Sequence, residues 1–139
     1  MHLSRLLHND IKGNNVLLKG VSLDPALIDM GKVTSRSFPE AYKLTASQKE
    51  RYNRNYPHLA WELRNLYGAK QTIRSDIYSL GYLFQHIGNP SNSFLKQLSK
   101  HMMKECPEKR ISVPDTLKLF EKSINSKDFV FELHHFINN

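Results

Sequence analysis

Side chains suited to phosphoryl transfer are concentrated in two polar stretches, His8 to Asn15 and Asp29 to Gly31. Phosphoryl transfer requires positioning, metal ions that neutralise the phosphates, and a carboxylate that orients the attacking hydroxyl. Asp10 is able to accept the proton of that hydroxyl, and Lys12 is able to contact a phosphate oxygen as a point charge. Asn15 and Asp29 supply the oxygen ligands that magnesium prefers. Together these residues favour phosphoryl transfer from a magnesium nucleotide.

Two short apolar runs are predicted to hold these stretches in place. Val16–Lys19 and Ala26–Ile28 have the length and composition of strands. Turn signals lie between them at Gly20–Ser22 and Asp24–Pro25. The sequence therefore predicts a hairpin. The polar loop precedes its first strand and Asp29 follows its second strand, as the chemistry requires.

The segment from Lys32 to Pro57 is polar and aperiodic, and we expect it to be a long loop. A loop of this length inside a compact domain is usually functional or disordered. Between Lys32 and Arg54 there are six basic residues and two acidic ones, Glu40 and Glu50. These basic side chains could bind an acidic segment or a phosphate.

Helices are predicted for the rest of the chain. The first begins after an N-cap at Ser75 and ends at Gly88–Pro90. Its inward positions are apolar and leave few polar residues, which predicts deep burial. These positions are Ile77, Tyr78, Leu80, Leu83, Phe84 and Ile87.

Two further helices and a tail complete the prediction. The second helix is capped by Ser91 or Asn92 and ends at Pro107. The third begins at Val113–Asp115 with proline in its first turn, and its apolar residues are Leu117, Leu119, Phe120 and Ile124. The tail from Phe129 to Ile137 is apolar enough to dock as a last helix or strand.

The composition indicates a single domain. The chain has 139 residues, of which 40% are apolar, and this is enough to build a core. No apolar run approaches the ~18 residues of a membrane-spanning helix, and the N-terminus lacks the apolar region of a secretory signal. The single cysteine, Cys106, cannot form an internal disulfide and fits a reducing compartment. We expect a cytoplasmic protein without membrane association.

The net charge of +7 would suit an anionic partner. The basic residues are scattered along the chain, however, and aromatic residues do not alternate with them as a base-stacking surface requires. We therefore expect no nucleic-acid partner and interpret most of this charge as solvated surface.

The order of these motifs resembles the catalytic domain of eukaryotic, serine/threonine-like protein kinases. His8–Asp10 is similar to the family's His-Arg-Asp, Asn15 falls at the expected offset, and Asp29–Gly31 is similar to Asp-Phe-Gly. Further likenesses follow in order along the chain. Ala60–Glu62 is similar to the family's Ala-Pro-Glu, and Ser75–Gly81 is similar to its central buried helix. Cys106–Arg110 is similar to its acid-Pro-x-x-Arg stretch.

The resemblance implies a fold. It covers roughly residues 1 to 124 and implies a mainly α structure, the kinase large lobe, with a small two-stranded β-hairpin at the active-site loop. Residues 1–139 would form a partial kinase domain without the N-terminal lobe, and 32–59 would be its activation segment. We expect the machinery that covers the nucleotide phosphates to be missing, and hence little turnover by the isolated chain.

The resemblance also implies roles for individual residues. Asp10 would be the catalytic base and Lys12 would meet the transferred phosphate. ATP and Mg²⁺ would be the cofactors, with the metal held by Asn15 and Asp29 and the adenine ring above Leu17. Two structural roles are implied as well. Asp76 would accept backbone N–H bonds from His8 and Asn9, and Glu62 would form a buried ion pair with Arg110.

The chain departs from the family pattern at several positions. Asn9 replaces an arginine that receives a phosphorylated activation segment, Met30 replaces phenylalanine and Trp61 replaces proline. No threonine stands where the family has one, in the stretch Asn55–Leu59. There is also no glycine-rich G-x-G-x-x-G phosphate cover.

Three readings of the function remain open from the sequence. The chain is a portion of a kinase acting on protein serine or threonine, a pseudokinase-like module that binds protein without catalysis, or a gene fragment that folds poorly. A protein substrate or binding partner is expected in the first two readings. The sequence does not indicate the oligomeric state.

Overall fold

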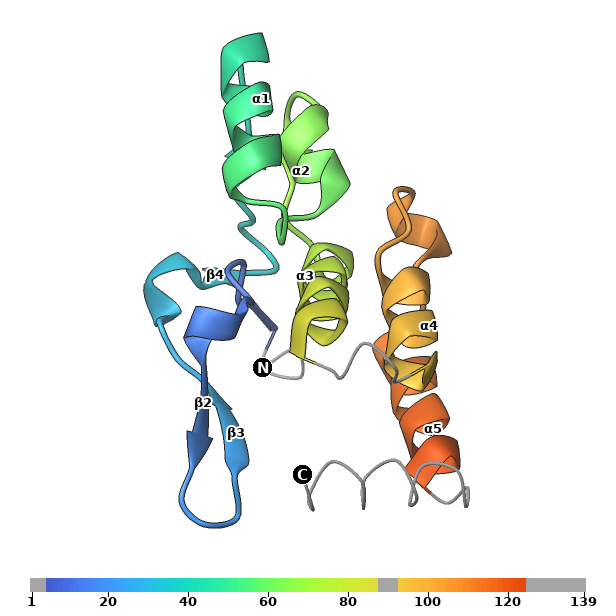
Figure 1. Ribbon diagram of the computed structural model, residues 1–139. Coiled ribbons are helices and arrows are strands. Elements are labelled where there is room, and N and C mark those ends of the chain that lie inside the picture. Colours follow the sequence, from blue (N-terminus) through green and yellow to red (C-terminus); the bar gives the residue numbers. More distant parts are fainter. Residues whose placement is uncertain (1–4, 88–92, 125–139) are drawn as a thin grey trace.

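The computed structural model describes residues 5–87 and 93–124. Short strands and the hairpin lie in the first part of the chain, and helices form the rest (Figure 1). The helices are α1 (Ala46–Asn55), α2 (Trp61–Asn65), α3 (Ile73–Ile87), α4 (Ser93–Met102) and α5 (Val113–Ile124). Short 3-10 helices occupy Gly13–Asn15, Met30–Lys32 and Pro107–Lys109.

The strands form three small antiparallel pairs in the described chain. These are β1 (Leu6–Leu7) with β4 (Thr34–Ser35), β2 (Val16–Lys19) with β3 (Asp24–Leu27), and β5 (Ala41–Tyr42) with β6 (Ala69–Lys70). The β2–β3 pair is the predicted hairpin, and Val16 pairs with Leu27 at its base. Asp24 and Pro25, expected in the turn, belong instead to β3, where Pro25 pairs with Leu18 at an edge that tolerates proline.

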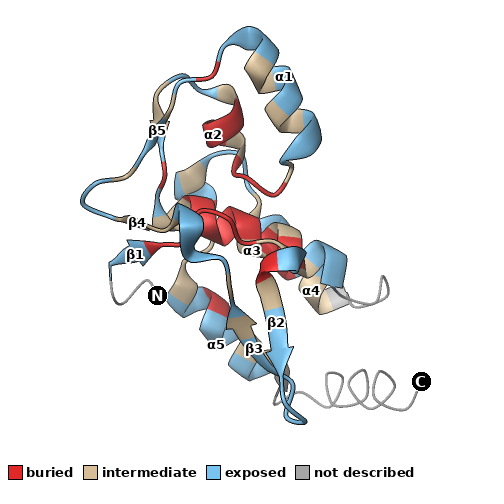
Figure 2. Cartoon of the chain, turned by 90° about the vertical axis from the view of Figure 1, so that its left-hand side faces the viewer, coloured by how far each residue is buried: buried red, intermediate tan, exposed pale blue. Residues whose placement is uncertain are grey.

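Helix α3 is the buried centre of the fold, as Figure 2 shows by its colour. Its Tyr78 packs in a cluster with Ala60 and Leu63 near α2. Its Ile77 packs with Leu98 and Met102 of α4 in a second cluster. Since these neighbours in sequence point into different clusters, α3 connects the two parts of the core. The prediction of a deeply buried helix is confirmed for Ile77, Tyr78 and Leu83, whereas Ile87 at its end is 56% exposed.

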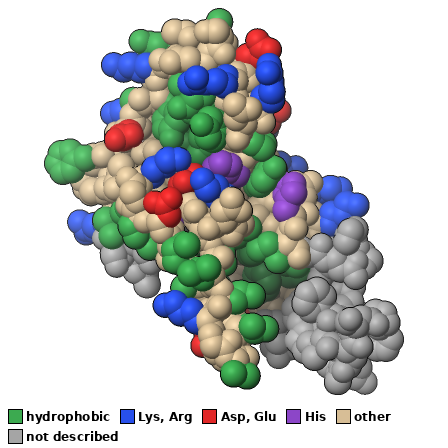
Figure 3. Space-filling view, turned by 60° about the vertical axis from the view of Figure 1, so that its left-hand side comes forward, with side chains coloured by type: hydrophobic (Ala, Val, Ile, Leu, Met, Phe, Trp, Pro, Cys, Tyr) green, Lys and Arg blue, Asp and Glu red, His purple; other side chains and the backbone are tan. Residues whose placement is uncertain are grey.

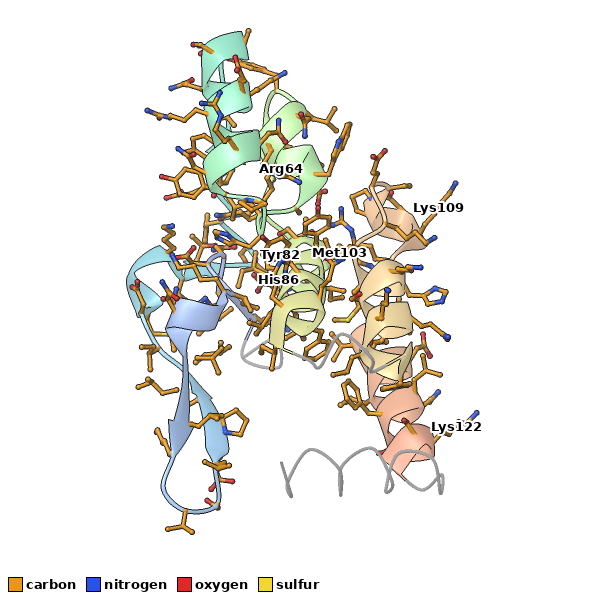
Figure 4. The ribbon with its side chains drawn as sticks, viewed as in Figure 1. Arg64, Tyr82, His86, Met103, Lys109 and Lys122 are labelled. Carbon is orange, nitrogen blue, oxygen red and sulfur yellow. The ribbon has the colours of Figure 1, made fainter. Side chains whose placement is uncertain are left out.

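Helices α3 and α4 approach closely at Gly81. A Cβ atom at this position would lie 2.6 Å from Cβ of Met102 and 3.0 Å from Cγ of Met103. Figure 4 shows Met103 beside α3, just after the end of α4. The missing side chain of Gly81 therefore sets the separation of the two helices.

Helix α1 lies inside the segment that was predicted to be a loop, and that prediction was wrong for 46–55. The Thr45 side chain accepts a hydrogen bond from the Gln48 N–H, and the Gln48 side chain accepts one from the Thr45 N–H. This capping box starts the helix. None of its residues is fully buried, so the helix needs no apolar periodicity, and its sequence has none that would have predicted it.

Three other helix predictions need correction or fall outside the description. Helix α3 begins at Ile73, so Ser75 is not its N-cap but lies inside the first turn, where its hydroxyl bonds to Thr72. Helix α5 begins at Val113 as predicted, but Leu117 and Leu119 are 58% and 38% exposed. The expected stop at Gly88–Pro90, the caps Ser91 and Asn92 and the tail Phe129–Ile137 lie outside the described residues.

The predicted ion pair between Glu62 and Arg110 is confirmed. The Arg110 guanidinium donates to both Glu62 carboxylate oxygens, at 2.8 and 2.5 Å. Its remaining N–H groups donate to the carbonyls of Arg74, Lys104 and Glu105. All five guanidinium hydrogens are thus used, and Arg110 is only 2% exposed. The pair holds α2 against the loop that precedes α5.

No helix in the described ranges 5–87 and 93–124 has both the length and the apolar character needed to cross a bilayer.

We predict that Arg110→Ala lowers the free energy of unfolding by about 3–5 kcal/mol, because it leaves the Glu62 carboxylate buried without its partner. Urea denaturation followed by circular dichroism measures this loss. Lys109→Ala is the matched control, since Lys109 is exposed and projects outward in Figure 4. A loss for Arg110→Ala below about 1 kcal/mol, typical of exposed pairs, would contradict the role assigned to the pair.

Candidate active site

The loop that carries Asp10 is fastened to α3 by Asp76. The two carboxylate oxygens of Asp76 accept the backbone N–H groups of His8, at 2.8 Å, and of Asn9, at 2.9 Å. All three residues are buried, with Asp76 only 1% exposed. The role implied by the kinase resemblance is therefore confirmed for Asp76. This anchor fixes the backbone immediately before Asp10.

Asn9 links the same loop to the segment after Asp29. Its backbone is left-handed, with φ of 65°, a conformation that asparagine tolerates better than most residues. Its side-chain amide donates to the Lys32 carbonyl at 2.7 Å and to the Thr34 hydroxyl at 2.9 Å. The short amide side chain of Asn9 thus hydrogen-bonds directly to the segment that follows Asp29.

Asp10 is the most heavily contacted carboxylate of the site. Its Oδ2 atom accepts from Lys12 Nζ at 2.9 Å and Asn15 Nδ2 at 3.1 Å, and it lies 3.2 Å from Lys32 Nζ. Its Oδ1 atom lies 3.1 Å from His58 Nε2. Asp10 itself is 2% exposed. Lys12 and Asn15, which were predicted as site residues, both contact Asp10, and Lys32 and His58 join them.

The charge of Asp10 is stabilised by these partners. Burial by itself would raise the pKa of Asp10, but hydrogen bonds from Lys12, His58 and Lys32 outweigh it and lower the pKa from 3.8 to about 2. A carboxylate with so low a pKa remains ionised at neutral pH and is a weak base. It is suited to orienting a hydroxyl through a hydrogen bond and accepting its proton late in a reaction.

His58 is a residue of the site that sequence reasoning missed. It lies in the stretch where the kinase threonine was sought, and its ring is buried against Asp10. Burial lowers the pKa of His58 below 6.5, although the nearby Asp10 carboxylate raises it. The ring is therefore neutral at pH 7, and its Nε2–H donates to Asp10. Its position just before Ala60–Glu62 was the available signal.

His58 also belongs to a row of aromatic rings. Its ring centroid is 6.3 Å from that of Tyr56 and 6.4 Å from that of Tyr82. Tyr82 in turn stacks on His86, with centroids 4.1 Å apart, and both lie along α3 in Figure 4. These contacts hold the imidazole between the α1–α2 connection and α3.

The hairpin register brings Asn15 next to the residues around Asp29. The Asn15 carbonyl accepts the Ile28 N–H at 2.9 Å, directly beyond the Val16–Leu27 pair. The Asn15 side chain donates to the Asp10 carbonyl at 2.8 Å and to Oδ2 of Asp10. These two bonds use the amide nitrogen of Asn15 and leave its amide oxygen as a possible ligand. Asn15 is buried, whereas Asp29 is exposed.

Asp29 occupies a left-handed turn at the end of the hairpin, with φ of 60°. Its Oδ1 atom accepts the Gly31 N–H at 3.3 Å. A Cβ atom on residue 31 would lie 3.2 Å from this oxygen, so glycine gives the carboxylate room to rest over the turn. The Asp-x-Gly pattern thus has a geometric reason in this chain.

The donor chemistry of Asn15 and Asp29 fits a magnesium ion shared with a nucleotide. Both offer oxygen atoms, and Mg²⁺ is commonly held by one or two such side chains, with phosphates and water completing its shell. Across the described residues, no three or more His, Cys, Asp or Glu side chains are grouped to hold a metal.

Leu17, predicted to lie under adenine, is on β2 and is 50% exposed. Leu18, Val21 and Leu23 on the same hairpin are more exposed still. Figure 3 shows these apolar side chains along the hairpin that projects at the bottom of the view. Leu17 is thus free to contact a planar ring, and the hairpin presents an apolar surface.

Comparison of the sequence with models of protein families found no match, and comparison with curated proteins found none either.

We predict that Asp76→Asn loosens the loop that holds Asp10. The amide keeps only one of the two acceptor oxygens, and its NH₂ group faces the second N–H donor, so about 1–3 kcal/mol of stability should be lost. Hydrogen exchange should show faster exchange of the His8 and Asn9 amides than in the unaltered chain. Unchanged protection of both amides would contradict the anchoring role.

We also predict a pH dependence that originates at His58. Its pKa is lowered in the folded chain, so the unfolded chain binds more protons below about pH 6.5, and stability should fall as the pH drops from 7 to 5. Asp10 acts at lower pH. Its stabilisation of about 2 kcal/mol should be lost as the pH falls from about 4 to 2.

Thermal unfolding across this pH range tests the assignment. His58→Gln retains a side-chain N–H donor but does not titrate, so its stability should fall less between pH 7 and 5. His101→Gln is the matched control, because His101 is exposed on α4. Parallel pH profiles for the unaltered chain and His58→Gln would refute the role of His58.

Proposed function

We propose that this chain is the large-lobe portion of a protein kinase, which transfers the γ-phosphate of ATP to serine or threonine hydroxyls of a protein. The observation that supports this best is the Asp10 network. A buried carboxylate, Lys12 and Asn15 contact one another on one loop, and the hairpin register brings Asn15 beside the turn of Asp29. These groups have the chemistry that phosphoryl transfer requires.

Each residue has a distinct part in this proposal. Asp10 orients the acceptor hydroxyl, since its low pKa keeps it ionised as a hydrogen-bond acceptor. Lys12, which is 33% exposed, turns from Asp10 toward the transferred phosphate. Asn15 and Asp29 would hold Mg²⁺, which neutralises phosphate charge when bound, and Leu17 would contact the adenine ring.

We infer that the isolated chain binds nucleotide but turns it over slowly. Leu17 and Asp29, the residues assigned to the nucleotide, are exposed to water. Electrostatic stabilisation of a transition state is far stronger in a site that excludes water. A further domain or protein that covers the hairpin would exclude water from these residues.

The second candidate is a pseudokinase-like module that binds protein without catalysis. The exposed leucines and valine of the hairpin favour it, because apolar side chains gathered on a surface commonly mark an interaction site. The two candidates differ in whether the Asp29 carboxylate is needed for binding nucleotide.

We predict that Mg²⁺-ATP raises the melting temperature of the purified chain by several degrees at nucleotide concentrations about tenfold above Kd. Asp29→Ala should abolish the shift. Asp24→Ala is the matched control, because it removes an exposed carboxylate at the far end of the same hairpin and should leave the shift unchanged. A folded chain that shows no magnesium-dependent shift would reject the kinase proposal in favour of the module.

A further inference from the structure

A second concave surface lies away from the Asp10 site, at the beginning of α3. It encloses about 770 Å³ between β1, the segment after β4, the end of β6, the first part of α3 and the start of α5. We call it the α3 groove. Its apolar wall includes Leu7, Ile73, Ile77 and Val113. Leu7 and Ile77 also stand next in sequence to the anchored pair His8 and Asp76, so the wall is built on a fixed part of the fold.

The polar part of the α3 groove is basic. Arg36, Lys70 and Arg74 line it, and no acidic residue of the described chain does. Arg36 and Lys70 are exposed, and none of the three forms an ion pair within the described residues. Arg74 is held in place because its guanidinium donates to the Arg110 carbonyl. The groove therefore presents basic side chains around an apolar surface.

These features select the chemistry of an occupant. A groove with an apolar wall and a cationic rim complements a segment that alternates apolar and acidic side chains. A second copy of this chain is a poor fit, because two chains of net charge +7 repel one another. Nucleic acid is also a poor fit, because no aromatic residue lines the groove to stack on a base.

We propose that the α3 groove is a docking site for a short, extended, acidic and apolar peptide segment of a partner protein. The apolar side chains of the segment contact Leu7, Ile73 and Val113, and its carboxylates meet Arg36, Lys70 and Arg74. The groove contains none of the residues assigned to ATP, Mg²⁺ or the transferred phosphate. Docking is thus independent of the proposed catalysis, and each proposal is tested by its own experiment.

Fluorescence anisotropy with the full chain and a labelled peptide, Glu-Leu-Glu-Phe-Glu-Leu-Glu, tests the proposal. The same peptide with lysine in place of glutamate should bind at least about tenfold more weakly. Binding of the acidic peptide should weaken as salt is raised, because the rim charges are exposed to solvent.

Charge reversal locates the site. Arg36→Glu and Lys70→Glu should each weaken binding about tenfold, because each replaces an attraction at the rim by a repulsion. Lys19→Glu is the matched control, since it changes net charge equally on an exposed residue at the end of β2. It should leave the affinity within about twofold. Thermal unfolding verifies that each variant is folded before binding is measured.

Several results would overturn the proposal. Equal affinity for the acidic and basic peptides, or equal weakening by Lys19→Glu and Lys70→Glu, would show that the groove does not select the peptide. A single-stranded oligonucleotide that binds more tightly than the peptide, and that loses this binding in the Lys70→Glu variant, would assign the surface to nucleic acid. Self-association in sedimentation that Arg36→Glu abolishes would assign it to a second copy.

Discussion

The carboxylate of Asp76 is the constraint on which the rest of the structure depends. Burying the polar loop around Asp10 removes backbone and side-chain groups from water, and such burial is costly unless every group finds a partner. Asp76 meets the N–H groups of His8 and Asn9 from the first turn of α3, at 2.8 and 2.9 Å. Helix α3 is itself fixed by two hydrophobic clusters and by the close approach at Gly81. The core thus dictates where the loop lies.

Charge compensation around Asp10 is the second condition for a buried site. Lys12 and Lys32 lie on one side of the carboxylate and the neutral ring of His58 lies on the other. This arrangement stabilises the charge on Asp10 in a buried position, because a buried ion without partners would be protonated or would unfold the chain. It also limits the chemistry, since a carboxylate held at a pKa of about 2 orients a hydroxyl better than it abstracts a proton.

The same end of α3 borders both candidate sites. Asp76 in the first turn of α3 holds the loop that carries Asp10, and Ile73, Arg74 and Ile77 line the α3 groove. Arg74 connects this groove to the Glu62–Arg110 pair, because it contacts the Arg110 carbonyl while its own carbonyl accepts from the Arg110 guanidinium. A segment bound in the groove would therefore lie against the interactions that hold α2.

The sequence by itself determined the elements whose signals are local. The hairpin follows from two short apolar runs and their turn, and α5 follows from its proline start. The resemblance to kinases further implied the contacts of Asp76 and of Glu62 with Arg110, and both are present. Helix α1 was not predicted because a helix at the surface requires no apolar stripe. Only the tertiary structure decided that His58 and Lys32 meet Asp10, since such contacts between distant segments arise from packing around α3 and leave no periodic trace in the chain.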